Sequence, residues 1–143
     1  MPTPLARRFS FILLPLAFML LLSSCAEPPY KNIDNTQLET LLSQKMALYD
    51  IRRPDEWKQT GVVPGSRLLT FVDGRGKLHP EFFSKFLARQ KKDEPVILIC
   101  RTGNRTSVLS QMLTEQAGFS KVYNVTDGIV KWIDGKNPVV KAP

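Results

Sequence analysis

Residues 96–107 read VILICRTGNRTS, and this stretch gives the strongest indication of the fold class. Its first four residues, 96–99, are large, apolar and uninterrupted, which is typical of a strand buried on both faces of a parallel sheet. Cys100 ends this strand, and a polar loop with two arginines and one glycine separates it from a helical pattern. The sequence therefore places a thiol at the carboxyl end of a central strand, where open α/β sheets form their sites.

The loop after Cys100 has the features that favour a thiolate over a thiol. Successive N–H groups in a tight loop before a helix form a nest that binds anions, and Gly103 permits the left-handed curl that such a loop needs. Arg101 and Arg105 add fixed positive charge for an anionic substrate. We therefore expect Cys100 to be a reactive nucleophile. The alternative is an inert buried cysteine that ends a core strand.

Helical and strand patterns alternate along the rest of the chain. A helix is expected to start with a capping box formed by Asp34 and Gln37. The further expected elements are strands at 46–49, 68–72 and 121–125, helices at 82–87 and 107–116 (with Val108, Leu109, Met112 and Leu113 on one side), and a helical turn around Trp132. This alternation predicts an α/β fold with an open parallel sheet covered by helices on both faces.

The first 24 residues read as an export signal. Arg7 and Arg8 precede an apolar stretch, residues 9–22, that is shorter than the roughly 20 residues a membrane span needs. An uncleaved membrane anchor is the alternative. A twin-arginine export signal is disfavoured because polar Ser10 stands where an apolar residue would be wanted.

Residues 22–25, Leu-Ser-Ser-Cys, resemble the lipobox of bacterial lipoproteins. The resemblance implies that residues 1–24 are removed, that Cys25 is lipidated, and that several acyl chains hold the protein stably on a membrane. Ala26, which is not aspartate, implies the outer membrane of a two-membrane cell. The expected organisation is a signal peptide at 1–24, a lipid-anchored tether at 25–32 and one periplasm-facing domain at 33–143.

Removing the signal leaves 119 residues, which suffice for one small domain. They carry 18 Lys and Arg residues against 13 Asp and Glu residues, and this moderate positive charge suits anionic substrates or lipid headgroups, or simply a solvated surface. The sequence contains no motif of interleaved aromatic and basic residues, so nothing in it indicates nucleic-acid binding. If Cys25 carries lipid, Cys100 has no partner for an internal disulfide, and one histidine beside one free cysteine argues against a metal site.

Five motifs in order give the chain from residue 33 to residue 140 a resemblance to the rhodanese family of sulfurtransferases. LYDIR at 48–52 resembles the family's first-strand element "LxDxR", PDEW at 54–57 resembles its "PxE(Y/F)" turn, and GVVPGS at 61–66 resembles "GHIPGA". CRTGNR at 100–105 fits the six-residue active-site loop, and residues 127 to 139 fit the family's ending. Two positions depart from the family pattern. Val62 stands where histidine is frequent, and Asp127 stands where a second glycine is usual. We interpret both as changes of loop packing, although Asp127 would add a negative charge near the site.

The resemblance implies a rhodanese-like fold and covalent sulfur transfer. The Cys100 thiolate attacks the outer sulfur of a donor such as thiosulfate, sulfite leaves, and a persulfide forms on Cys100. Cyanide in vitro, or a thiol in the cell, then takes the sulfur, and no metal or organic cofactor is needed. The persulfide would be cradled by the amides of Thr102, Gly103, Asn104 and Arg105, and the donor's anionic end would be held by Arg101 and Arg105.

Other residues are expected to support this site rather than react. We assign Asp50 and Arg52 to a buried or half-buried ion pair. His79 is not needed as a general base, because a thiolate is already ionised. We expect a monomer.

Three alternatives stay open beside thiosulfate transfer. The first is a non-catalytic rhodanese-like module that binds a partner protein. The second is a phosphatase or an arsenate reductase-like enzyme. Cysteine phosphatases place five residues between Cys and Arg, whereas four separate Cys100 from Arg105 and Thr106 takes the phosphatase position. The third is an envelope persulfide carrier with a protein donor, which the sequence cannot distinguish from thiosulfate transfer.

Overall fold

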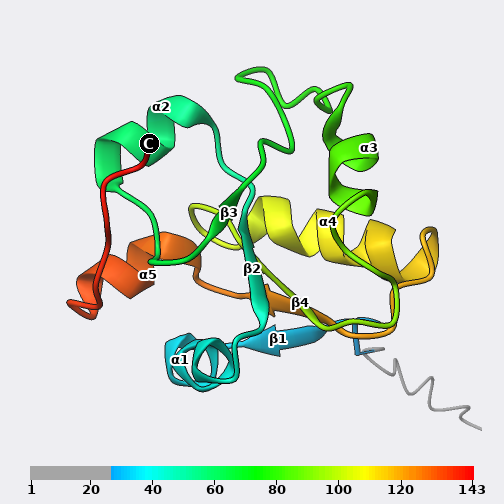
Figure 1. The fold of residues 1–143 in the computed structure, drawn as a ribbon, viewed down its shortest axis with the longest axis horizontal. Helices are drawn as coiled ribbons and strands as arrows, with labels where there is room; N and C mark the ends of the chain where they lie inside the picture. The colour runs from blue at the N-terminus through cyan, green and yellow to red at the C-terminus, as the bar shows by residue number, and fades with distance from the viewer. Residues whose placement is uncertain (1–26) are drawn as a thin grey trace, which may run out of the picture.

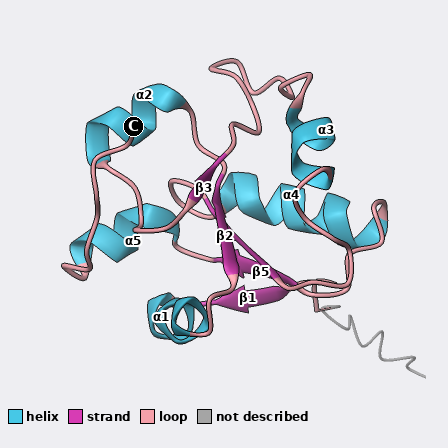
Figure 2. Ribbon diagram, viewed as in Figure 1, coloured by secondary structure: helices cyan, strands magenta, loops and turns pink. Residues whose placement is uncertain are grey.

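The structure, a computed structural model, describes residues 27–143. They form one five-stranded parallel sheet with the strand order β1-β5-β4-β2-β3, covered by helices on both faces (Figures 1 and 2), as the sequence predicted. The elements are β1 (Lys31–Ile33), α1 (Asn35–Ser43), β2 (Ala47–Asp50), α2 (Pro54–Thr60), β3 (Arg67–Leu68), α3 (Phe82–Leu87), β4 (Val96–Ile99), α4 (Asn104–Glu115), β5 (Val122–Val125) and α5 (Gly128–Asp134). The expected signal peptide and Cys25 lie outside the described residues.

Strand β4 is the centre of the core, and all four of its residues are fully buried. Because side chains alternate along a strand, Val96 and Leu98 face an apolar cluster that includes residues of α3 and α4. Ile97 and Ile99 face a second cluster that includes residues of α1 and α5. The two helix layers stand on opposite sides of the sheet in Figure 2. The unbroken apolar run at 96–99 is thus explained by burial on both faces.

Three expected boundaries differ from the structure. The expected tether at 25–32 ends earlier, because Lys31 and Asn32 belong to β1, which pairs with β5. The expected turn at 54–57 is the start of α2, where Pro54 occupies the first helical position and needs no N–H partner. The expected strand at 68–72 is reduced to β3, and Val72 instead forms an antiparallel bridge with Leu78.

Helix α4 also differs from its expected form. It begins at Asn104, three residues before the expected start at 107. Val108, which was expected on the packed side, is 55 % exposed. The buried stripe includes Thr106 and Ser110 beside Leu109 and Leu113, and these two small polar residues shift the packed face away from Val108.

The C-terminal segment returns from α5 to α2, as the red end of the ribbon shows in Figure 1. Val62 and Val140 exchange two backbone hydrogen bonds of 2.9 Å in an antiparallel bridge. The indole N–H of buried Trp132 donates to the carbonyl of Pro138 at 2.8 Å. Across residues 27–143, the structure contains no helix with the length and apolar character needed to cross a membrane.

Candidate active site

Cys100 lies at the carboxyl end of β4, buried, with 1 % of its surface exposed. The N–H of Gly103 donates to its Sγ at 3.2 Å, and Thr106 Oγ1 lies 3.5 Å from the same sulfur. The Thr106 hydroxyl donates to the Gly103 carbonyl at 2.9 Å, so a neutral thiol would donate to Thr106 Oγ1. After ionisation, this hydroxyl could turn its hydrogen to the sulfur, because hydroxyl hydrogens rotate freely.

Two glycines hold the loop after Cys100 against the turn between β5 and α5. Gly103 has φ +88°, and a Cβ there would lie 1.8 Å from the carbonyl oxygen of Thr126. Gly128 has φ +62°, and a Cβ there would lie 2.4 Å from the carbonyl oxygen of Arg101. Both positions therefore require glycine for backbone angle and for space.

The start of α5 fixes the loop further through its backbone. The N–H of Ile129 donates to the carbonyl of Cys100 at 2.8 Å, and the N–H of Val130 donates to that of Arg101 at 3.2 Å. Asp127, whose charge the sequence placed near the site, is exposed at the N-terminal cap of α5, directly before Gly128. Val62 is buried against Val140, which agrees with its interpretation as a packing change.

Helix α4 directs its positive end at the site. It begins at Asn104, so the first N–H groups of the helix have no acceptor within it. Together with the helix dipole, these groups favour negative charge at this position. Of the amides predicted to cradle the sulfur, the one that the structure places on Sγ is that of Gly103.

Arg105 makes a two-pronged ion pair with Glu56 of α2, with N–O distances of 2.8 and 2.6 Å. Glu56 also accepts a hydrogen bond of 3.1 Å from the N–H of Arg53. Burial alone would raise the pKa of Glu56, but the hydrogen bonds from Arg105 and Arg53 and the charges of both arginines hold it below its ordinary value.

The same contact pairs Arg105 with a carboxylate, and the predicted role of Arg105, to hold the anionic end of the donor together with Arg101, stays a prediction. The hydrogen bond to Glu56 raises the pKa of Arg105, and burial opposes the rise. The charge of Glu56 and, more weakly, that of ionised Cys100 add to it. Arg105 therefore lies close to the sulfur, but a carboxylate offsets its charge. The "PxE" motif contains Glu56, yet the motif by itself did not indicate this role for the carboxylate.

The other loop residues expected to bind substrate lie at the surface. Arg101, Thr102 and Asn104 are exposed. Among residues 27–143, Arg101 makes no ion pair, so its charge is available to a ligand. The structure thus brings Cys100 and Arg105 together and leaves Arg101, the residue after Cys100, exposed at the surface.

The expected ion pair of Asp50 and Arg52 is confirmed and fully buried, with an N–O distance of 2.7 Å. Arg52 also donates to Thr60 Oγ1 at 2.8 Å and to the Gly61 carbonyl at 2.9 Å. The pair thereby joins the end of β2 to the end of α2, the helix that carries Glu56.

His79 does not join the site through its hydrogen bonds. Its Nδ1 accepts a bond of 3.4 Å from the N–H of Glu81, and no side-chain hydrogen bond within residues 27–143 connects it to Cys100. In the same part of the chain, no group of three or more His, Cys, Asp or Glu residues is arranged to hold a metal ion.

Comparison with known proteins gives consistent results. The family model of the rhodanese-like domain matches residues 34–134. Thiosulfate sulfurtransferase GlpE of Pseudoalteromonas translucida is 30 % identical over 104 residues, covering 72 % of this chain and 89 % of the relative. A putative mitochondrial thiosulfate sulfurtransferase of Schizosaccharomyces pombe is 28 % identical over 108 residues, covering 73 % and 75 %. The crystal structure of a rhodanese-related protein from Thermoplasma volcanium matches with a TM-score of 0.61 and 26 % identity, covering 79 % of this chain and all of that one.

Proposed function

Because this chain belongs to the rhodanese-like domain family, we propose that it is a sulfurtransferase that carries sulfane sulfur as a persulfide on Cys100. The strongest support comes from the hydrogen bond of 3.2 Å that the Gly103 N–H donates to Cys100 Sγ at the positive end of α4. A sulfur atom in this position gains charge stabilisation as a thiolate and again as a persulfide anion. Relatives named as sulfurtransferases support the same reaction class.

The proposed donor is thiosulfate or a related small anion. The Cys100 thiolate attacks the outer sulfur of thiosulfate, the S–S bond of the donor breaks, and sulfite leaves with the bonding electron pair. Cys100 then carries the transferred sulfur as a persulfide anion. Arg101, which follows Cys100, is exposed and has no ion pair among the described residues, and it would hold the sulfonate end of the donor.

The second half of the reaction regenerates the thiolate. Cyanide or a thiolate attacks the outer sulfur of the persulfide, and the new bond forms as the S–S bond to Cys100 breaks. Products are thiocyanate or a new persulfide, and no electrons are gained or lost overall. Since an S–S bond is about 2 Å long, the transferred sulfur stands about 2 Å beyond the Sγ of the buried Cys100, where the acceptor would have to reach it.

Burial of Cys100 favours a small donor over a protein donor in the first step. Only 1 % of the cysteine surface is exposed. A donor protein would have to bring its own persulfide up to this buried sulfur, whereas thiosulfate presents its outer sulfur at the end of a small ion. The envelope persulfide carrier with a protein donor is therefore the second candidate.

The proposed location is the bacterial envelope. Residues 22–25 support lipidation at Cys25 through their lipobox pattern, and Ala26 supports the outer membrane. In this proposal the domain faces the periplasm as a lipid-anchored monomer.

Steady-state kinetics would test the reaction. We expect thiocyanate to form from thiosulfate and cyanide with the parallel-line pattern of a double-displacement reaction, and we expect Cys100→Ser to abolish it. Hydrolysis of an aryl phosphate by the same preparation, together with no thiocyanate, would contradict sulfur transfer and favour the phosphatase alternative.

A further inference from the structure

A row of exposed cations lies along the amino ends of the strands, the edge of the sheet opposite to Cys100. Each strand begins at a lysine or arginine or follows one closely, and this holds across the whole width of the sheet. In spatial order, the residues are Lys31 at β1, Lys121 before β5, Lys91 and Lys92 before β4, Lys45 before β2, and Arg67 at β3. With Arg89, which is also exposed, we name these seven residues the basic edge.

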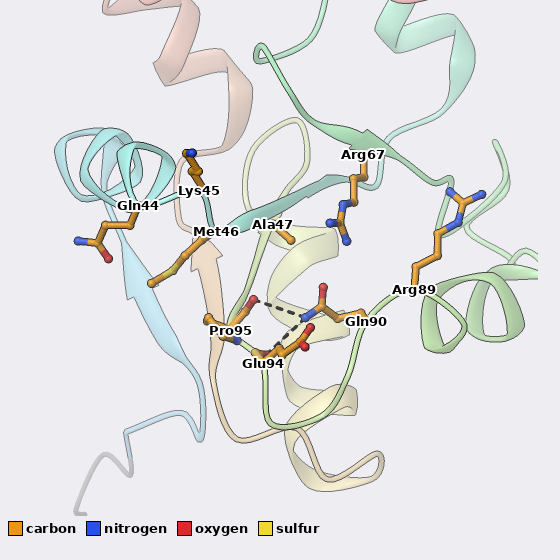
Figure 3. A pocket seen from close by; sticks show the side chains of 9 residues that line it. All are labelled: Gln44, Lys45, Met46, Ala47, Arg67, Arg89, Gln90, Glu94 and Pro95. Carbon is orange, nitrogen blue, oxygen red and sulfur yellow. Dashed lines mark hydrogen bonds between the residues drawn. The ribbon is translucent and has the colours of Figure 1, made fainter.

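The basic edge contains a hollow of about 340 Å³ (Figure 3), whose charged lining consists of the cations Lys45, Arg67 and Arg89 and one carboxylate, Glu94. Figure 3 shows Lys45 and Arg89 on either side, with Arg67 reaching from β3 toward Gln90. The Arg67 guanidinium donates to the Tyr49 hydroxyl at 3.1 Å and lies 5.4 Å from the centre of its ring. These contacts fix one cation at the hollow, which is large enough for a phosphate headgroup.

The charge of the basic edge is not cancelled by nearby carboxylates. Four exposed acidic residues lie on the same side, Glu27, Asp93, Glu94 and Glu115, against seven cations. One of them, Glu94, pairs with Lys91 at 3.4 Å, and both side chains remain exposed. At the opposite edge, Asp34 stands directly after β1, Asp50 ends β2, and Asp127 stands two residues after β5. Arg52, which pairs with Asp50, and Arg101 and Arg105 lie at that edge too, so both signs of charge occur beside Cys100, whereas cations predominate along the basic edge.

The N-terminal segment leaves the domain at the same basic edge. Pro28 to Lys31 lie beside Ser120 to Tyr123, at the amino end of β5. The six-residue step from Cys25 to Lys31 can span at most about 20 Å. A lipid on Cys25 would therefore hold the basic edge close to the bilayer surface. At such short range the negative potential of anionic lipids attracts lysine and arginine side chains.

We propose that the basic edge is a docking face for the anionic surface of a lipid bilayer, which turns the Cys100 loop toward the aqueous space. The proposal rests on the proposed lipid anchor and goes beyond it. An anchor alone would leave the domain free to rotate on its tether, whereas a docked basic edge fixes its orientation. Lipid phosphates would bind along the strand ends, with one in the hollow lined by Lys45, Arg67 and Arg89.

Lysine acylation on vesicles would test this orientation. The full chain, purified from bacterial membranes, is reconstituted into vesicles of phosphatidylcholine alone or mixed with phosphatidylglycerol. Lysines are acylated with a soluble reagent and read by peptide mass spectrometry. On anionic vesicles we expect the acylation rates of Lys31, Lys45, Lys91, Lys92 and Lys121 to fall by a factor of about five. Lys58 of α2 and Lys131 of α5 should keep their rates.

Salt and matched variants make the test specific. Raising salt from about 0.1 M to about 1 M shortens the Debye length from about 10 Å to about 3 Å and should restore acylation. Lys91→Glu with Lys92→Glu, in an exposed loop, should weaken the protection, as should Lys45→Glu with Arg67→Glu. Lys58→Glu with Lys131→Glu has the same change in net charge and should leave the protection intact.

Equal acylation on both kinds of vesicle, or protection that salt does not reverse, would overturn the proposal. Equal loss of protection in the Lys58 and Lys131 variant would also overturn it, because net charge alone would then explain the binding. The mass of the Cys25 peptide in the same digests shows whether the anchor is acylated. Thiocyanate formation by the same vesicles shows whether sulfur transfer is intact, so failure of either underlying proposal is seen separately.

Discussion

Arg105 stands beside the reactive sulfur, and Glu56 determines how much of its positive charge a donor experiences. The two side chains meet through two hydrogen bonds although 49 positions separate them in the sequence. Arg101, by contrast, is exposed and has no ion pair among residues 27–143. We therefore assign attraction of the donor to Arg101. Arg105 lies near the sulfur, but its charge is offset by Glu56.

Replacing Glu56 by glutamine should release the charge of Arg105. We expect the KM for thiosulfate to fall severalfold, because an anionic donor would meet an unpaired guanidinium. The free energy of unfolding should fall by about 1–3 kcal/mol, because a hydrogen bond to a charged group is lost in a half-buried place. Steady-state kinetics and urea unfolding measure the two effects.

The neighbouring carboxylate offers a control for this variant. Asp55 is exposed and pairs with Arg53 at 3.0 Å, and Asp55→Asn should change neither quantity appreciably. A rise in the KM of the Glu56 variant would contradict our assignment, since it would mean that Glu56 places Arg105 for the donor.

The depressed pKa of Glu56 also predicts how stability depends on pH. A carboxylate whose pKa is lower in the folded state contributes stability above its ordinary value of 4.5, and this contribution is lost as pH falls through the folded value. Urea unfolding at neutral pH should therefore show a larger difference between wild type and Glu56→Gln than unfolding near pH 3, below the ordinary value for glutamate. An unchanged difference would show that the ion pair contributes no pH-dependent stability.

At the scale of residues, the sequence predicted groups that act through local spacing. Cys100, Gly103 and the pair of Asp50 and Arg52 fall within short motifs, so their roles follow from neighbours along the chain. The contact of Glu56 with Arg105 depends on how α2 and α4 meet in space, and no local pattern contains that information. The sequence therefore did not predict this ion pair, and the role of Arg105 in holding the donor stays a prediction.

At the scale of elements, the turn between β5 and α5 shapes the loop that holds the sulfur. Gly128 lies against the carbonyls of Arg101 and Cys100, and α5 donates two hydrogen bonds to the same carbonyls. Helix α5, which begins 28 residues after Cys100, therefore supports the geometry of the loop that contains the nucleophile.

Alanine at Gly128 should damage both stability and sulfur transfer. Its Cβ would lie 2.4 Å from the Arg101 carbonyl oxygen, so the loop or α5 would have to move. Gly118→Ala is the matched control, because Gly118 has φ +76° but open space where a Cβ would stand. The control should lose only about 1–2 kcal/mol from the left-handed backbone and keep its kcat. Equal kcat values in the two variants would contradict the supporting role of the turn.

The elements that the sequence predicted best are those with buried apolar runs. Strand β4 and helix α1, with its capping box, were confirmed because burial and capping leave local signals. Strands β1 and β3 are short and lie at the two edges of the sheet, so their pairing depends on neighbours that a local pattern does not reveal. The start of α4 was placed too late because its N-cap residue, Gly103, makes no side-chain cap hydrogen bond and therefore leaves no local capping signal.

At the scale of the whole molecule, the C-terminal segment closes the domain over α2 and α5. Residues 137–140 contribute the bridge between Val62 and Val140 and the acceptor for Trp132. Asn137 adds a hydrogen bond from its N–H to the Trp132 carbonyl. Ending the chain after residue 136 should therefore lower the free energy of unfolding by about 4 kcal/mol, at about 1 kcal/mol for each of four lost hydrogen bonds. Thermal or urea unfolding measures the loss.

A shorter truncation provides the control for this prediction. Removing only residues 141–143 keeps Val140 and Pro138, and it should leave stability nearly unchanged. If both truncations have the same stability, the segment does not close the domain in solution.

The intact mass of the protein shows whether Cys100 accepts a sulfur atom. A soluble form that starts after Cys25 is incubated with thiosulfate beside its Cys100→Ser variant. We expect a gain of one sulfur atom in the first protein, no gain in the variant, and loss of the added mass with release of thiocyanate when cyanide is added. No gain in mass, with Cys100 still open to alkylation, would contradict thiosulfate as donor. No gain and no alkylation would contradict a reactive Cys100 altogether.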